Sequence, residues 1–231
     1  MVDKDGLLLS GRNDLTPDQR VYAQLSDRVA GWPRTFQDQV GLADVVGRIE
    51  ATVLIGLSTV GGAFTESIVR EMARKVDRPI RFPLSNPTAR SEANAEDLVH
   101  WTAGRVLLAT GSPYAPVEFD GRLIPIAQCN NVFIFPAVGL GLVASRASRV
   151  TDGMILAAAR ALGDHSPAKT NPSASLLPAI GSIRSVAVAI AAAVGLEAQR
   201  AGLAPKTSPE ELRERIAASQ WTPQFPLFET G

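Results

Sequence analysis

Short apolar runs and amphipathic segments alternate along the first half of the chain. Residues 52–56, 79–84 and 105–109 have the length and apolar character of strands. Between them, residues 63–74 and 94–101 carry apolar positions at helical spacing. This alternation predicts an α/β fold with a doubly wound parallel sheet and flanking helices. Because residues 52–56 are mostly apolar, we expect that strand to be covered on both faces.

Two more helices are predicted ahead of these strands. Thr16-Pro17-Asp18-Gln19 is a capping-box pattern with Pro at the first helical position. Residues 38–50 carry apolar positions at a spacing compatible with a helix, and Asp38 is placed to cap it.

The second half of the chain has a different pattern. Residues 111–131 are rich in Pro and Gly, and the rest is mostly helical in character. Three helices are predicted there: one that opens at Thr151, one along 183–194 and one over 208–218. We therefore expect a sheet domain over residues 1–145 and, packed on it, a helical C-terminal tail over 146–231.

The charges are balanced, since 23 Lys and Arg accompany 23 Asp and Glu. This argues against an extended nucleic-acid footprint, so no nucleic-acid partner is predicted. Cys129 is the single cysteine, which excludes an intrachain disulfide and favours a reducing compartment. The longest apolar runs, 132–144 and 186–196, are shorter than the roughly 18–20 residues of a membrane span, and no signal peptide is evident. We expect a cytoplasmic protein without a membrane partner.

Three segments lie where parallel sheets bind ligands, beyond the carboxyl ends of strands. Residues 56–62 are Gly-rich, and a structural turn and a ligand loop are equally good interpretations. Asn86 precedes a proline and is either a turn residue or a ligand amide. Asn130 and Asn131 are either a helix cap or paired ligand amides. Without a Ser-His-Asp set or a P-loop, the residues alone predict an α/β ligand-binding domain with no visible catalytic set.

Four motifs in these regions resemble the C-terminal part of malic enzyme. They are LIGLSTVGGAFTE at 54–66, FPLSNPT at 82–88, ATGSPYAPV at 109–117 and QCNNVFIFP at 128–136. Their order and spacing match the family, and the similarity extends over essentially the whole chain. The QCNN sequence resembles the bacterial NAD-dependent branch, whereas Ala137 stands where the family has a glycine.

The resemblance implies an incomplete Rossmann-like domain of an enzyme that converts (S)-malate to pyruvate and CO₂ with NAD and a divalent Mg²⁺ or Mn²⁺. It implies that Asn86 and Asn130 contact malate. The residues implied to contact NAD are Asp3, Gly56, Leu57, Ser58, Asn86 and Asn131. Asp3 would accept the adenosine ribose hydroxyls and, with Asp5 nearby, would disfavour the 2′-phosphate of NADP.

Several family features belong to an N-terminal part that this sequence does not match. They are the tyrosine acid, the lysine base, the acidic metal ligands and the glycine-rich pyrophosphate turn. No catalytic or metal-ligating residue is therefore assigned here, and we expect a fragment, a truncated reading frame or one piece of a split enzyme.

The expected partners are malate or pyruvate, together with further copies of the chain or an N-terminal malic enzyme half. The alternative is an inactive remnant that binds only nucleotide or a partner chain. A lone copy would lack the first strand and helix of its own sheet, so the opening edge of that sheet should be exposed.

Overall fold

The computed structural model describes residues 1–221, which divide into two compact units. Unit 1 spans Met1–Cys129 and unit 2 spans Asn130–Gly231. The division falls earlier than the expected domain boundary between residues 145 and 146, because helix α5 (Phe135–Ser145) packs against α7 (Ile183–Arg200) in unit 2. Residues 222–231 of the expected helical tail lie outside the described residues.

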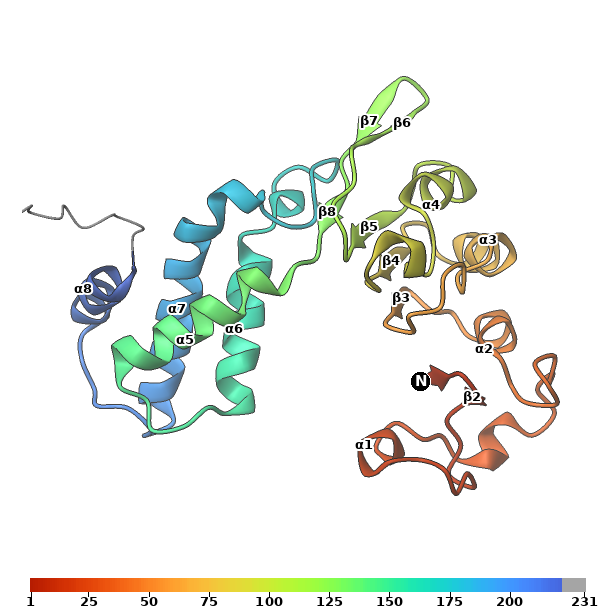
Figure 1. Cartoon of the computed structure of the whole chain (residues 1–231), viewed down its shortest axis with the longest axis horizontal. Coiled ribbons are helices and arrows are strands. Elements are labelled where there is room, and N and C mark those ends of the chain that lie inside the picture. Colours follow the sequence, from red (N-terminus) through yellow and green to blue (C-terminus); the bar gives the residue numbers. More distant parts are fainter. Residues whose placement is uncertain (222–231) are drawn as a thin grey trace, which may run out of the picture. The chain divides into compact units, whose positions relative to one another are not determined.

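Unit 1 contains the predicted parallel sheet (Figure 1). Its strands, in the order in which they pair, are β3 (Val53–Gly56), β4 (Ile80–Pro83), β5 (Leu107–Thr110) and β8 (Ala127–Gln128). All of these pairings are parallel, with Val53 opposite Ile80 and Ile80 opposite Leu107. The connecting helices are α3 (Glu66–Lys75) and α4 (Ala95–Trp101), and η2 (Thr88–Arg90) is a 3₁₀ turn. The α/β class and the parallel sheet are confirmed.

The apolar faces of the connecting helices form the core of this sheet. On α3, Ile68, Val69 and Met72 are buried at helical spacing. The largest cluster comprises Phe64, Val69, Ala93, Ala95, Leu98, Val99, Val106 and Leu108. Because both helices are anchored in this way, the loops that follow the strands rest on a packed base.

β3 is an edge strand, and the prediction that it is covered on both faces was wrong. Val53 and Ile55 are 42% and 55% exposed, and β4 is the one strand partner of β3 in the part of the chain described. A short apolar strand has the same sequence pattern whether or not another element covers its outer face. The outer edge of this first strand is exposed, as expected.

A small hairpin and short helices precede the sheet. They are β1 (Val2–Asp3), β2 (Gly6–Leu7), α1 (Pro17–Arg20), the 3₁₀ turn η1 (Ser26–Val29) and α2 (Leu42–Arg48). β1 and β2 pair in antiparallel fashion. At α1, Thr16 and Gln19 form the predicted capping box.

Helix α2 begins after Gly41, and Asp38 does not cap it. Asp38 has a φ of 61° and lies ahead of the helix. The Asp44 carboxylate, inside the first turn, accepts a hydrogen bond from Gly41 N at 2.9 Å. Residues 38–41 therefore form the approach to the helix and not its first turn.

A second hairpin lies in the segment that was predicted only as turn-rich. β6 (Val117–Phe119) and β7 (Arg122–Ile124) pair in antiparallel fashion. Asp120 and Gly121 form the turn with φ values of 51° and 68°. An Asp-Gly pair between apolar residues is a strong hairpin signal that the sequence analysis did not use.

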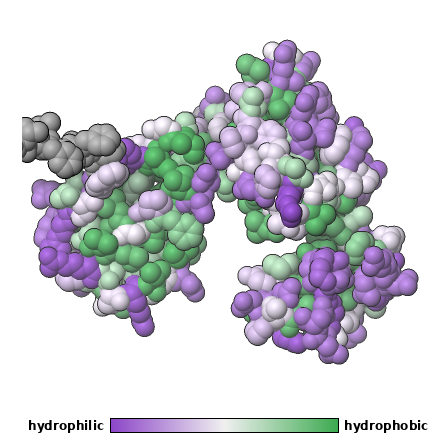
Figure 2. Space-filling model, in the orientation of Figure 1, coloured by the Kyte–Doolittle hydropathy of each residue, from purple (hydrophilic) through white to green (hydrophobic). Residues whose placement is uncertain are grey.

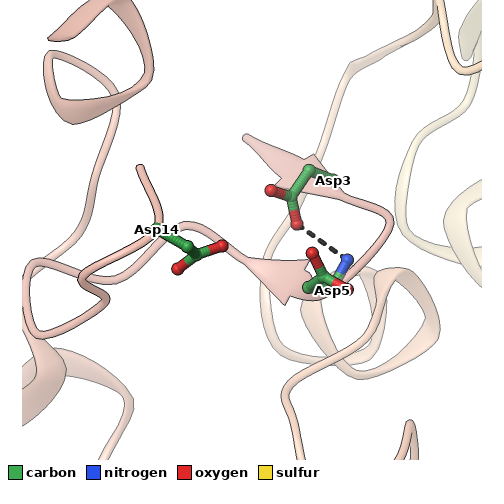
Figure 3. A group of neighbouring side chains, drawn as sticks. All are labelled: Asp3, Asp5 and Asp14. Carbon is green, nitrogen blue, oxygen red and sulfur yellow. Dashed lines mark hydrogen bonds between the residues drawn. The ribbon is translucent and has the colours of Figure 1, made fainter. Parts of the chain in front are cut away.

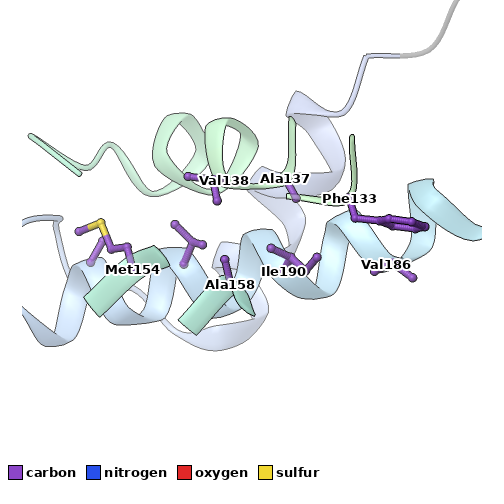
Figure 4. Close-up of a cluster of buried hydrophobic side chains, with 9 residues drawn as sticks. Phe133, Ala137, Val138, Met154, Ala158, Val186 and Ile190 are labelled. Atoms are coloured by element: carbon purple, nitrogen blue, oxygen red, sulfur yellow. The ribbon is translucent and has the colours of Figure 1, made fainter. Parts of the chain in front are cut away.

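Unit 2 is helical, as predicted. Besides α5 and α7 it contains η3 (Asn131–Phe133), α6 (Asp152–Asp164), η4 (Pro167–Lys169), η5 (Ile180–Ser182) and α8 (Pro209–Ser219). Val186 and Ile190 of α7 pack with Phe133 and Met154 in its main core cluster (Figure 4). Hydrophobic residues also reach its surface (Figure 2). Phe135 is 71% exposed.

One helical segment, Ile180–Arg200, is long and apolar enough to cross a membrane by length and composition. This segment is longer than the apolar run at 186–196, because the helix continues on both sides of the run through residues that are not all apolar. Val186, Ile190 and Val194 are each less than 5% exposed within the unit 2 core. One face of this helix is therefore packed against other helices.

Candidate functional site

The carboxyl ends of the parallel strands carry the predicted loops. Gly56 ends β3, and Leu57 and Ser58 follow it directly. Asn86 lies just beyond the end of β4 and is exposed. Because β3 and β4 are parallel neighbours, these residues share one edge of the sheet.

A carboxylate that the sequence analysis did not select joins the two loops. Glu92 is 0% exposed. Its Oε1 accepts hydrogen bonds from Ser58 N and Ser58 Oγ, both at 2.8 Å, and from Ser85 Oγ at 2.5 Å. Its Oε2 accepts one from Ser85 N at 3.3 Å. Burial alone would raise the pKa of Glu92, but the hydrogen bonds from Ser85 and Ser58 outweigh it and lower the pKa, so the carboxylate is charged at neutral pH.

The same two serines fix the rest of the β3 loop. Ser85 Oγ accepts a hydrogen bond from Thr59 N at 2.9 Å, and Ser58 Oγ accepts one from Val60 N at 3.1 Å. Thr59 has a φ of 58°, a left-handed conformation that β-branched residues rarely adopt. The loop is thus held in a strained conformation by side chains of its neighbour.

Two glycines permit these close approaches. A Cβ at Gly56 would lie 2.5 Å from Cδ of Glu92, and a Cβ at Gly111 would overlap the carbonyl oxygen of Leu84. Gly56 therefore has a structural function here, whatever contact it also makes with a ligand.

The Asn86 side chain is oriented by the loop that follows β5. Ser112 Oγ donates a hydrogen bond to Asn86 Oδ1 at 2.5 Å. Among the described residues, no acceptor takes a hydrogen bond from Asn86 Nδ2. The amide therefore presents its N–H groups as donors at an exposed position.

The end of β8 is tied to the same loop. Gln128 Nε2 donates to Gly111 O at 3.3 Å, and Cys129 N donates to Thr110 O at 2.9 Å. Burial raises the pKa of the Cys129 thiol, which disfavours the reactive thiolate.

Asn130 and Asn131 open unit 2. Asn130 Oδ1 accepts a hydrogen bond from Val132 N at 2.9 Å, so Asn130 is the N-cap of η3. Asn131 is exposed at the first position of that turn. The cap interpretation of Asn130 is confirmed, and its Nδ2 has no acceptor in the part of the chain described.

Asp3 lies in the β1–β2 hairpin and is paired with an arginine. Arg12 Nη1 and Nη2 lie 2.8 and 2.9 Å from the two oxygens of Asp3, and Arg12 Nη2 lies 2.6 Å from Asp14. The Asp5 amide also donates to Asp3 Oδ1 at 2.9 Å (Figure 3). Burial would raise the pKa of Asp3, but the hydrogen bonds from Arg12 and Asp5 lower it. No hydrogen bond among residues 1–221 links Asp3 to the β3 or β4 loops.

Neither group of carboxylates found among residues 1–221 fits a divalent metal. Among the described residues, Asp3, Asp5 and Asp14 bring carboxylate oxygens within 4.8 Å of one another (Figure 3). The Arg12 guanidinium, however, already forms ion pairs with Asp3 and Asp14 and occupies oxygens of both. At the sheet edge, Glu92 is buried and already accepts four hydrogen bonds. Neither group offers the open, multiply charged oxygen set that Mg²⁺ or Mn²⁺ requires.

A cleft of about 420 Å³ lies beside the β3 loop. Gly61, Thr88, Trp101 and Tyr114 are among the residues that line it, and the buried Tyr114 Oη has no hydrogen-bond partner among the described residues. Gly61 and Gly62 of the predicted 56–62 loop line this cleft, but none of the residues implied to contact malate or NAD does.

Comparison with known proteins decides the family. Residues 1–199 match the family model of the malic enzyme NAD binding domain. The chain belongs to the malic enzyme family. The NAD-dependent malic enzyme of Shewanella sp. (strain MR-4) is 48% identical over 229 residues, which are 99% of this chain and 41% of the relative. That of Sodalis glossinidius (strain morsitans) is 48% identical, over 97% of this chain and 40% of the relative. This malic enzyme chain thus spans about two fifths of these relatives.

Solved structures agree with the fold. Malic enzyme from Entamoeba histolytica superposes with a TM-score of 0.69 at 23% identity, over 92% of this chain and 40% of the other. Malic enzyme from Pyrococcus horikoshii gives a TM-score of 0.60 at 28% identity, over 78% of this chain and 37% of the other. The family resemblance seen in the four motifs and the Rossmann-like fold are confirmed.

Three side chains that shape this site were not predicted from the sequence: Glu92, Ser112 and Arg12. Ser112 lies inside the ATGSPYAPV motif and could have been selected from it. Glu92 and Arg12 lie outside the four motifs, and Ser58 is 34 positions from Glu92 while Asp3 is nine from Arg12.

Proposed function

We propose that this malic enzyme chain provides the NAD and malate contacts of an NAD-dependent malic enzyme, which converts (S)-malate to pyruvate and CO₂. Family membership and the names of the relatives support this proposal. The proposed partners are further copies of the chain or a chain with the rest of a malic enzyme, and the proposed location is the cytoplasm.

Asn86 carries the proposal. Ser112 occupies its acceptor oxygen, so its exposed Nδ2 is left to donate. Asn130 is likewise left with Nδ2 as a donor, because its Oδ1 already accepts a hydrogen bond from Val132 N. Amide N–H groups suit the carboxylate and hydroxyl oxygens of malate, and we assign both asparagines to malate on this ground.

The cofactor contacts are assigned to the loop after β3 and to the β1 strand. Gly56, Leu57 and Ser58 present backbone at a sheet edge, and Leu57 is 75% exposed. Asn86 and Asn131 are assigned to the nicotinamide side. Asp3 Oδ1 already accepts from Arg12 and from the Asp5 amide, whereas Oδ2 accepts only from Arg12 and keeps a lone pair for a ribose hydroxyl. Bound NAD would accept a hydride from malate, and the residues of this chain would bind and orient the two ligands.

Calorimetric titration of the purified chain with NAD, with and without malate, tests the proposal. We expect NAD to bind and malate to tighten that binding. Asn86→Ala should reduce the factor by which malate lowers the Kd of NAD by about 10- to 100-fold. The reason is that a hydrogen bond to a charged ligand contributes about 1.5–3 kcal/mol. Asn94→Ala is the matched control: it removes the N-cap of α4 and should lower Tm while leaving the malate effect unchanged.

The outcomes separate the two candidate functions. Absence of NAD binding would refute the proposal, as would equal malate effects in wild type and Asn86→Ala. Binding of NAD without any effect of malate would instead support a chain that binds nucleotide only.

A further inference from the structure

The buried Glu92 carboxylate has an unusual environment. Ser58 and Ser85 donate four hydrogen bonds to it, and the largest causes that lower its pKa are hydrogen bonds from these neutral serines. A buried charge without an opposite charge is unfavourable unless its hydrogen bonds are complete. Here neutral donors from two loops supply them.

We propose that Glu92 is a positioning residue, which sets the ligand-facing loops after β3 and β4 in one fixed arrangement. Through Ser58 it fixes the backbone that we assign to NAD, and through Ser85 it fixes the residue next to Asn86. This inference rests on the proposed function for its ligand consequences, whereas the loop arrangement stands on the contacts alone.

Three features support the view that the contacts of Glu92 fix the conformation of the loops after β3 and β4. Its donors lie beyond the ends of β3 and β4 and belong to no strand or helix. Gly56 leaves the space that the carboxylate occupies. Ser85 Oγ, which donates to Glu92, also accepts from Thr59 N and so holds Thr59 at its positive φ. Strain of this kind persists only where the surroundings impose it.

The test compares wild type with Glu92→Ala, Glu92→Gln and a control, Thr102→Val. Thr102 is fully buried after the C-terminal end of α4, and its hydroxyl bonds only to carbonyls of that helix. A helix between parallel strands ends at their amino ends, so this control leaves the loops intact. Two quantities are measured: amide hydrogen exchange at Ser58 and Thr59, and the Kd of NAD in the presence of malate.

We expect Glu92→Ala to accelerate exchange at Ser58 and Thr59 and to raise the Kd about tenfold. Glu92→Gln keeps an oxygen for the three bonds of Oε1 and should stay within about threefold of wild type. Thr102→Val should lower Tm without changing either quantity. If Glu92→Ala does not fold, Ser85→Ala provides the milder test and should accelerate exchange at Thr59.

Unchanged exchange in a folded Glu92→Ala or Ser85→Ala variant would overturn the inference, as would equal changes in Thr102→Val. If wild type does not bind NAD, the proposed function fails, and the exchange rates still decide the role of Glu92.

Discussion

Replacing Arg81 with Met should stabilise unit 1. Arg81 is 0% exposed on β4, where β3 and β5 flank it, and none of the described carboxylates contacts it. Its guanidinium donates to Ile80 O at 3.1 Å and to Val69 O at 3.5 Å, while Nε has no partner. Methionine fills a similar volume without the charge.

The magnitude follows from the burial of the charge. Burial lowers the pKa of Arg81 from its ordinary value to about 10. At 1.36 kcal/mol per pH unit, this corresponds to a penalty of about 3 kcal/mol for the charged form. The two hydrogen bonds offset about 1–2 kcal/mol of that penalty. We therefore expect Arg81→Met to raise the free energy of unfolding by about 1–2 kcal/mol, within the range found when buried charges are replaced.

Urea unfolding followed by circular dichroism measures this change, and Tm should rise by about 2–4 °C per kcal/mol. Leu108→Met is the control, since Leu108 is opposite Arg81 on β5, is 4% exposed and is already apolar. It should cost less than about 1.5 kcal/mol. If Arg81→Met is less stable than Leu108→Met, the reasoning is refuted, because the contacts of the guanidinium would then outweigh its desolvation.

Two further predictions concern the sheet edge and the cofactor. Gly111→Ala should lower the free energy of unfolding by about 1–3 kcal/mol, as measured by thermal unfolding, because the new Cβ would overlap the backbone of Leu84. Gly139→Ala in α5 is the control: its Cβ would meet no atom within 4 Å, so the change should be neutral or stabilising. In calorimetric titrations NAD should bind more tightly than NADP. Asp5→Lys should reduce the ratio of the Kd for NADP to the Kd for NAD, because it adds a cation near Asp3. Asp77→Lys is the control: the Asp77 side chain is 92% exposed, and this change should leave the ratio unaltered. A preference for NADP, or a ratio unmoved by Asp5→Lys, would contradict our assignment of Asp3.

The strands and helices could be predicted because their signals are local. Apolar runs marked β3, β4 and β5, and the capping box at Thr16 marked the start of α1 to the residue. The outer face of β3 could not be predicted, since apolar side chains alone do not show what covers them.

The contacts within the candidate site are long-range, and a single sequence does not contain them. Ser58 and Glu92 are 34 positions apart, and Asn86 and Ser112 are 26 apart. Asn86 could be selected from a strand end and a motif, but the orientation of its amide depends on which hydroxyl the fold brings to it. Arg12 changes the interpretation of Asp3 for the same reason, because nothing in the Asp3-Lys4-Asp5 sequence predicts an arginine nine positions away.

The exposed outer edge of β3 affects how the protein behaves in concentrated solution. An edge with free backbone donors and acceptors accepts a strand from any other chain, and the exposed Val53 and Ile55 would favour such an addition. Natural sheets protect such edges with charged side chains, proline or a bulge, but Val53–Gly56 contains none of these. Aggregation should therefore rise steeply with protein concentration. Val53→Lys would reduce this aggregation with little loss of fold stability.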